Sequence, residues 1–130
     1  MKLSKIKFGL FLSFLVLSSF SNLNAQVVAV VNQADWCPTC KANGPRVSKE
    51  VLTTFGSDQI TLIENDLSNK KTKEESKLKL AAIGLAEQLK GNKTTGIIIL
   101  FDPKTKKEIG RISVAKSNDE IKTLIIGLIN

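Results

Sequence analysis

The residues of this chain best suited to chemistry are its two cysteines, Cys37 and Cys40. They form one C-x-x-C motif, and the chain contains no histidine. A cysteine pair at this spacing can exchange disulfides with another molecule, form a structural bridge or contribute to a metal site.

Two considerations favour disulfide exchange. A bridge between Cys37 and Cys40 closes a very short loop, so it removes little entropy from the unfolded chain and stabilises the fold weakly. Zinc normally takes four Cys, His or carboxylate ligands, so a site here needs carboxylates or a second chain with its own pair, and we assign no metal ligand. The structural bridge and the shared metal site stay open as alternatives.

The position of the motif predicts different roles for the two cysteines. It follows a short apolar run, residues 27–31, and precedes a segment with helical periodicity. A cysteine at the start of a helix lies near free N–H groups and the positive end of the helix dipole, which lower the pKa of a thiol. We expect an exposed Cys37 to be the nucleophile and Cys40, one turn later, to resolve the mixed disulfide. Pro38 suits a first helical turn because it has no N–H to leave unpaired.

Hydrophobic periodicity predicts the elements that position this motif. The predicted strands are residues 27–31, 60–63, 97–101 and 109–114. Three helices are predicted. The first follows the motif, has Pro45 in its first turn or at a kink, and ends at Gly56. The second runs from a capping box at Thr72 to Gly91, and the third runs from a capping box at Ser117 to the end of the chain. The fold class is therefore α/β, with the order βαβαββα and a mixed four-stranded sheet flanked by helices. Its first two strands are parallel and its last two form an antiparallel hairpin.

The N-terminus has the layout of a secretory signal peptide. Three lysines precede an apolar run from Phe8 to Leu17, and a polar stretch leads to Ala25. A membrane-spanning helix needs about 20 apolar residues, more than this run offers. We predict that residues 1–25 are a cleaved signal peptide and residues 26–130 one domain.

The charge balance gives little support to nucleic-acid binding. Removing the three signal lysines from the 19 basic side chains leaves 16, against 12 acidic ones. The clusters at residues 70–73 and 104–107 carry no aromatic side chains on which bases could stack. We expect no nucleic-acid partner.

Residues 34–41, with the sequence Ala-Asp-Trp-Cys-Pro-Thr-Cys-Lys, resemble the active site of the thioredoxin-like superfamily. A tryptophan directly before C-x-x-C and a lysine directly after it make the resemblance specific. It implies the family's minimal βαβαββα core and an active-site loop formed by Trp36, Pro38 and Thr39. It also implies that Thr95 and Gly96, at the start of the strongest predicted strand, contact the substrate.

Three positions depart from the family's pattern. Val31 stands six residues before Cys37, where the family has a buried acid that assists proton transfer. The lysine that partners this acid falls near Leu62, so we expect that proton route to be absent. Gly96 takes the place of the family's cis-proline, and a glycine does not favour a cis peptide bond.

The combined prediction is a thiol–disulfide oxidoreductase of the periplasm or an equivalent secreted space. Its partners would be protein thiols and disulfides, and the Cys37–Cys40 pair would be the redox centre, so we expect no bound cofactor. Outside the cytoplasm disulfides persist, so the pair would need a membrane-linked electron donor or acceptor. We expect a monomer, and the motif leaves the redox direction open. The alternative is a non-catalytic thioredoxin-like binding module, for a metal or a protein partner, which the three departures make credible.

Overall fold

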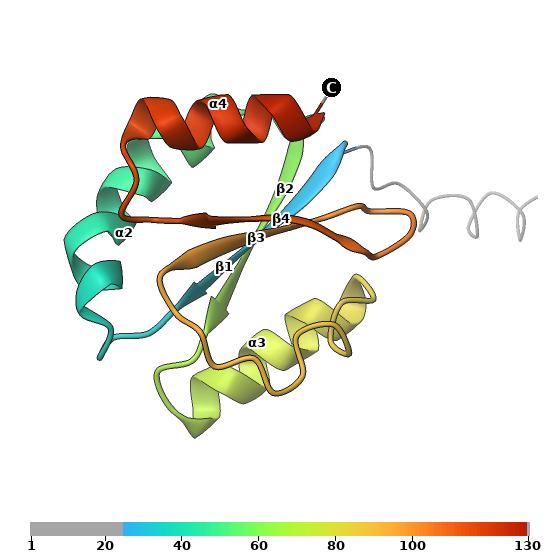
Figure 1. Ribbon diagram of the computed structural model, residues 1–130. Coiled ribbons are helices and arrows are strands. Elements are labelled where there is room, and N and C mark those ends of the chain that lie inside the picture. The colour runs from blue at the N-terminus through green and yellow to red at the C-terminus, as the bar shows by residue number, and fades with distance from the viewer. Residues whose placement is uncertain (1–24, 130) are drawn as a thin grey trace, which may run out of the picture.

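Four strands form one mixed sheet in the computed structural model, which describes residues 25–129 (Figure 1). They are β1 (Val27–Gln33), β2 (Ile60–Asp66), β3 (Ile97–Phe101) and β4 (Glu108–Ser113). Their order across the sheet is β2-β1-β3-β4. Strand β1 is parallel to β2 and antiparallel to β3, and β3 is antiparallel to β4. The predicted mixed sheet and its strand directions are confirmed.

Helices cover both faces of this sheet (Figure 1). They are α2 (Pro38–Glu50), the short 3-10 helix η1 (Leu52–Thr54), α3 (Lys70–Ala82) and α4 (Asn118–Ile129). Helices α2 and α4 lie on one face and α3 lies on the other. The predicted order βαβαββα is confirmed.

The two inner strands supply the core on both faces. Side chains alternate between the faces of a strand, so Ala29 and Ile98 pack under α2 and α4 while Val28 and Ile99 pack under α3. All four are buried. This double burial explains why β1 and β3 are continuous apolar runs in the sequence. The redox motif therefore follows one of the most firmly held strands.

Helix α3 differs from the prediction at both ends. Its N-cap is Asn69 rather than Thr72, and the Asn69 side chain accepts a hydrogen bond from the Thr72 N–H at 3.0 Å. The helix ends at Ala82, and the buried Leu85 and Leu89 lie in turns beyond it. The apolar spacing continues past the helix because these leucines fill the same core cluster.

Two other boundaries also differ from the prediction. Strand β2 continues through polar residues to Asp66, because its backbone stays paired with β1 as far as Gln33. Helix α2 begins at Pro38, contains Pro45 and ends at Glu50, so the segment up to Thr54 is a 3-10 turn rather than α-helix.

The predicted signal peptide, residues 1–25, lies outside the described residues except for Ala25. Among residues 25–129, no helix is both long enough and apolar enough to cross a membrane.

Candidate redox site

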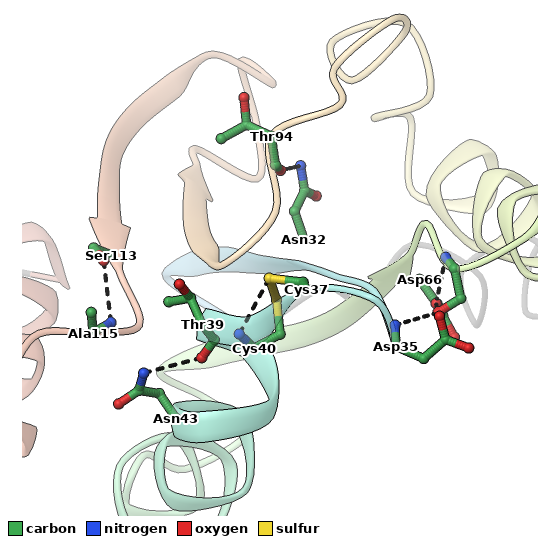
Figure 2. Close-up of a disulfide and its surroundings, with 11 residues drawn as sticks. Asn32, Asp35, Cys37, Thr39, Cys40, Asn43, Asp66, Thr94, Ser113 and Ala115 are labelled. Carbon is green, nitrogen blue, oxygen red and sulfur yellow. Dashed lines mark hydrogen bonds between the residues drawn. A yellow bond between two sulfur atoms is a disulfide. The ribbon is translucent and has the colours of Figure 1, made fainter.

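Cys37 and Cys40 form a disulfide at the start of α2 (Figure 2). Their Cα atoms are 5.2 Å apart. Cys37 is the N-cap of the helix, and its Sγ accepts a hydrogen bond from the Cys40 N–H at 3.2 Å. Pro38 occupies the first turn. One sulfur of the pair therefore lies at the positive end of the helix dipole, where it satisfies a backbone N–H that the helix leaves free.

Both cysteines are enclosed in this oxidised form. Cys37 is 4% exposed and Cys40 is 8% exposed. Ala34 and Leu67 pack against them. The prediction that Cys37 is exposed is therefore wrong for the disulfide, because Cys37 belongs to a small buried cluster with Ala34, Cys40 and Leu67.

The loop before the motif is held by the connection between β2 and α3. The Asp35 N–H donates to Ser68 Oγ at 2.8 Å, and Trp36 Nε1 donates to the Ser68 carbonyl at 3.2 Å. Ser68 Oγ in turn donates to Asp66. Trp36 is 56% exposed, so its ring stands at the surface beside the disulfide rather than in the core. Nothing in the sequence motif pointed to Ser68.

Gly96 lies next to the disulfide. A Cβ atom on Gly96 would be 3.3 Å from Thr39 Cγ2 and 3.8 Å from Cys37 Sγ. Its φ is +77°, a conformation that favours glycine. Thr39 and the loop before β3 thus meet next to the sulfur of Cys37.

Hydrogen bonds anchor this loop to β1 and to the end of β4. The Gly96 N–H donates to the Asn32 carbonyl at 2.8 Å, and the Gly96 carbonyl accepts from the Val114 N–H at 3.0 Å. The Asn32 side chain donates to the Thr94 carbonyl at 3.0 Å (Figure 2). Thr95 differs, because its N–H and C=O have no hydrogen-bond partner within the described part of the chain.

Solved structures with a similar fold are thioredoxins and thioredoxin-like proteins. A protein named Trxlp from Edwardsiella tarda is 19% identical with a TM-score of 0.52, over 83% of this chain and 91% of that one. Thioredoxin from Malassezia sympodialis is 17% identical with a TM-score of 0.52, over 81% and 79%. A thioredoxin-like superfamily protein is 13% identical with a TM-score of 0.57, over 83% and 82%. The chain has a thioredoxin-like fold. No family model and no characterised protein sequence matches it.

This thioredoxin-like fold, with a C-x-x-C disulfide at the start of a helix, supports a redox function in general. The family's acid position is filled by Val31, which is half-buried against the core. Glu64 is the residue of β2 that pairs with Val31, whereas Leu62 pairs with Ala29. The prediction that Leu62 holds the partner position is therefore wrong, because the register of the two strands places a carboxylate there.

Glu64 shares a hollow of about 430 Å³ with Cys40. Asp66 and Lys41 also line this hollow. Gln33 holds the Glu64 side chain in place, because Gln33 Nε2 donates a hydrogen bond to the Glu64 carboxylate at 3.2 Å. The site thus has no acid at position 31 and has an exposed one, Glu64, in the hollow that Cys40 also lines. Among residues 25–129, no group of three or more Cys, Asp or Glu side chains is arranged to hold a metal ion.

Proposed function

We propose that the chain is a thiol–disulfide oxidoreductase that exchanges disulfides with protein substrates through Cys37 and Cys40. The observation that carries this proposal is the position of the disulfide, with Cys37 Sγ as the cap of α2. A structural staple does not need that position, whereas a thiolate leaving group or nucleophile is stabilised by it.

The proposed exchange can run in both directions, and in each direction one disulfide is formed for each disulfide that is broken. In reduction, the Cys37 thiolate attacks a substrate disulfide, its S–S bond breaks, and one substrate sulfur leaves as a thiolate. Cys40 then loses its proton and attacks the sulfur of Cys37, which releases the second substrate thiolate. The protein dithiol becomes a disulfide while the substrate disulfide becomes a dithiol, and oxidation is the reverse. The direction follows from the potentials of the partners.

We assign the proton step to the hollow beside Cys40. Glu64 lines that hollow and is exposed, so water there can carry the proton of Cys40 to its carboxylate. Val31 cannot take this role because its side chain has no titratable group. The proton route would then enter from β2 rather than from β1.

We assign substrate contact to the loop before β3. The free N–H and C=O of Thr95 suit pairing with an extended substrate backbone, and the absent side chain of Gly96 leaves room beside Cys37. The reaction needs no bound cofactor. A monomer would suffice, because the proposed groups all belong to one chain.

The proposed location is the periplasm or another secreted space. It is supported by the lysines and apolar run of the first 25 residues. A membrane-linked donor or acceptor would then reset the pair between turnovers.

A non-catalytic binding module is the second candidate. The enclosure of both cysteines favours it, because a disulfide that is 4–8% exposed is a restricted target for an incoming thiolate. In this case the disulfide would only shape the surface near Trp36 and Thr39.

Reduction of insulin by dithiothreitol separates the two candidates. The oxidoreductase should accelerate precipitation of the insulin chains, and the Cys37→Ala variant should not. A Cys40→Ala variant should in addition accumulate a mixed disulfide with the substrate, visible by mass spectrometry. Equal rates for the wild type and Cys37→Ala would overturn the oxidoreductase and favour the binding module.

A further inference from the structure

A second hollow, of about 420 Å³, lies between Trp36, α3 and the turns that follow it. Its apolar lining includes Leu67, Leu80 and Leu89 together with Trp36. The loop around Gly96 does not line it, so it is separate from the substrate contacts proposed above. Trp36 directly precedes the redox motif, so a molecule bound in this hollow would contact the residue next to Cys37 in the chain.

A chain of buried amide groups ends in this hollow. The Thr94 carbonyl can only accept, so Asn32 turns its Nδ2 toward it, at 3.0 Å, and offers its Oδ1 to Asn65 Nδ2, at 2.9 Å. These two hydrogen bonds leave Asn65 Oδ1 without a partner among the described residues. Asn65 is only 5% exposed, yet every fully enclosed side-chain nitrogen and oxygen in residues 25–129 has a partner. Asn65 Oδ1 is therefore not fully enclosed, and Asn65 is one of the residues that line the hollow.

The rim of the hollow is strongly basic. Four exposed lysines line it, against a single acidic side chain, Glu87. The lysines are Lys73, Lys77, Lys90 and Lys93. The salt bridges found within residues 25–129 join other residues, so these four charges are available to a ligand. The clustering of like charge favours an anionic partner at physiological ionic strength.

We propose that this hollow, which Trp36 borders, docks an acidic segment of the substrate protein. The proposal rests on the proposed oxidoreductase function and names its substrate class. The segment would place an apolar side chain over Leu80 and Leu89, donate a backbone N–H to Asn65 Oδ1 and direct its carboxylates to the lysines.

The free acceptor distinguishes a peptide from other amphipathic anions. A fatty-acid chain can fill the apolar lining and its carboxylate can meet the lysines, but it has no N–H for Asn65 Oδ1. Leaving a buried acceptor unpaired under a ligand lowers the affinity for that ligand. A peptide bears both the donor and the charges, so the commitment is to a protein segment.

Trp36 provides a direct readout, because it is the only tryptophan and the chain has no tyrosine. The probe is a short cysteine-free peptide of alternating glutamate and leucine, blocked at both ends and titrated into the oxidised protein. We expect a saturable change in fluorescence that weakens as salt is added. A peptide with lysine in place of glutamate should not bind.

Variants assign the binding to the hollow. Lys77→Glu with Lys90→Glu should weaken binding roughly tenfold, since exposed charge contacts each contribute modestly. The matched control, Lys49→Glu with Lys122→Glu, makes the same change in net charge on α2 and α4 and should bind like the wild type. Ala86→Leu places extra side-chain volume in the hollow without touching the disulfide, and should abolish binding.

Three outcomes would overturn the proposal. They are the absence of binding, binding insensitive to the lysine pair, and dodecanoate that displaces the peptide and binds more tightly. Exchange of the oxidised protein with reduced glutathione, measured on the same sample, separates this result from the proposed function. Exchange without peptide binding overturns only the docking site, whereas peptide binding without exchange overturns the substrate role of the hollow.

Discussion

Helices α2 and α3 both begin with an N-cap side chain that accepts a backbone hydrogen bond, but the accepting groups differ. At α3, Asn69 Oδ1 accepts from the Thr72 N–H at 3.0 Å, and Thr72 Oγ1 accepts from the Asn69 N–H at 3.1 Å. At α2, Cys37 Sγ accepts from the Cys40 N–H at 3.2 Å. Asn69 is exposed, whereas Cys37 is 4% exposed. Each cap satisfies an N–H that the first turn leaves free.

The difference shows two uses of a helix N-terminus. The cap of α3 is an ordinary polar one whose contribution is stability. The cap of α2 is a sulfur that can change its oxidation state while it remains an acceptor, and reduction to a thiolate would add the negative charge that the helix dipole stabilises. In the proposed exchange, the fold would thus stabilise the leaving group before any substrate arrives.

Replacing Cys37 should have the largest effect on stability. Cys37→Ala removes both the bridge, which contributes about 2 kcal/mol for so short a loop, and the cap, which contributes about 1 kcal/mol. Cys37→Ser also removes the bridge but keeps an oxygen acceptor for the Cys40 N–H. In urea unfolding, the serine variant should therefore be the more stable of the two by about 1 kcal/mol. Equal stabilities would show that the sulfur is not acting as a cap.

Gly96→Ala should cost somewhat less. A side chain at φ +77° costs about 1–2 kcal/mol, and its Cβ would also press on Thr39 at 3.3 Å. Gly91→Ala is the matched control, because Gly91 has φ +74° and open space around it. Gly96→Ala should be the more destabilising in urea unfolding and should also slow exchange. If both variants behave alike, the contact between Gly96 and the active-site loop has no energetic consequence.

Asn69→Ala should lower the free energy of unfolding by about 1 kcal/mol, the usual cost of a lost cap. The rate of insulin reduction should not change, because Asn69 lies at the start of the other helix. A loss of activity would mean that α3 is coupled to the disulfide more tightly than the Ser68 contacts suggest.

Glu64→Gln should have the smallest effect, a few-fold slower exchange with unchanged stability. The carboxylate is exposed, so bulk water replaces much of its role as proton acceptor. The deficit should shrink as the pH rises, since solvent then removes the proton of Cys40 unaided. Glu74→Gln, an exposed change on α3, should leave the rate unaltered. Identical pH–rate profiles for Glu64→Gln and the wild type would remove Glu64 from the proton route.

The hydrophobic periodicity and the C-x-x-C motif were enough to predict the order of the elements, the mixed sheet and the cysteine pair. The apolar runs of β1 and β3 are unambiguous because both faces of these strands are buried. The polar end of β2 was missed because Glu64 to Asp66 are held by backbone pairing, which leaves no hydrophobic pattern.

The amide chain and Ser68 could not be predicted either, since both depend on strand register and loop geometry rather than on spacing. Asn32 and Asn65 are partners only because β1 and β2 pair them side by side. In the same way, Ser68 contacts Asp35 and Trp36 across a loop far away in the sequence.

The measurement to make first is the reduction potential of the Cys37–Cys40 pair. The purified protein, assayed for bound metal beforehand, is equilibrated with glutathione and dithiothreitol buffers, and Trp36 fluorescence reports the oxidised fraction. A redox-active cap predicts a single reversible two-electron transition with the same midpoint from either direction. A pair that stays oxidised throughout, or that carries a metal ion instead of a disulfide, would contradict it.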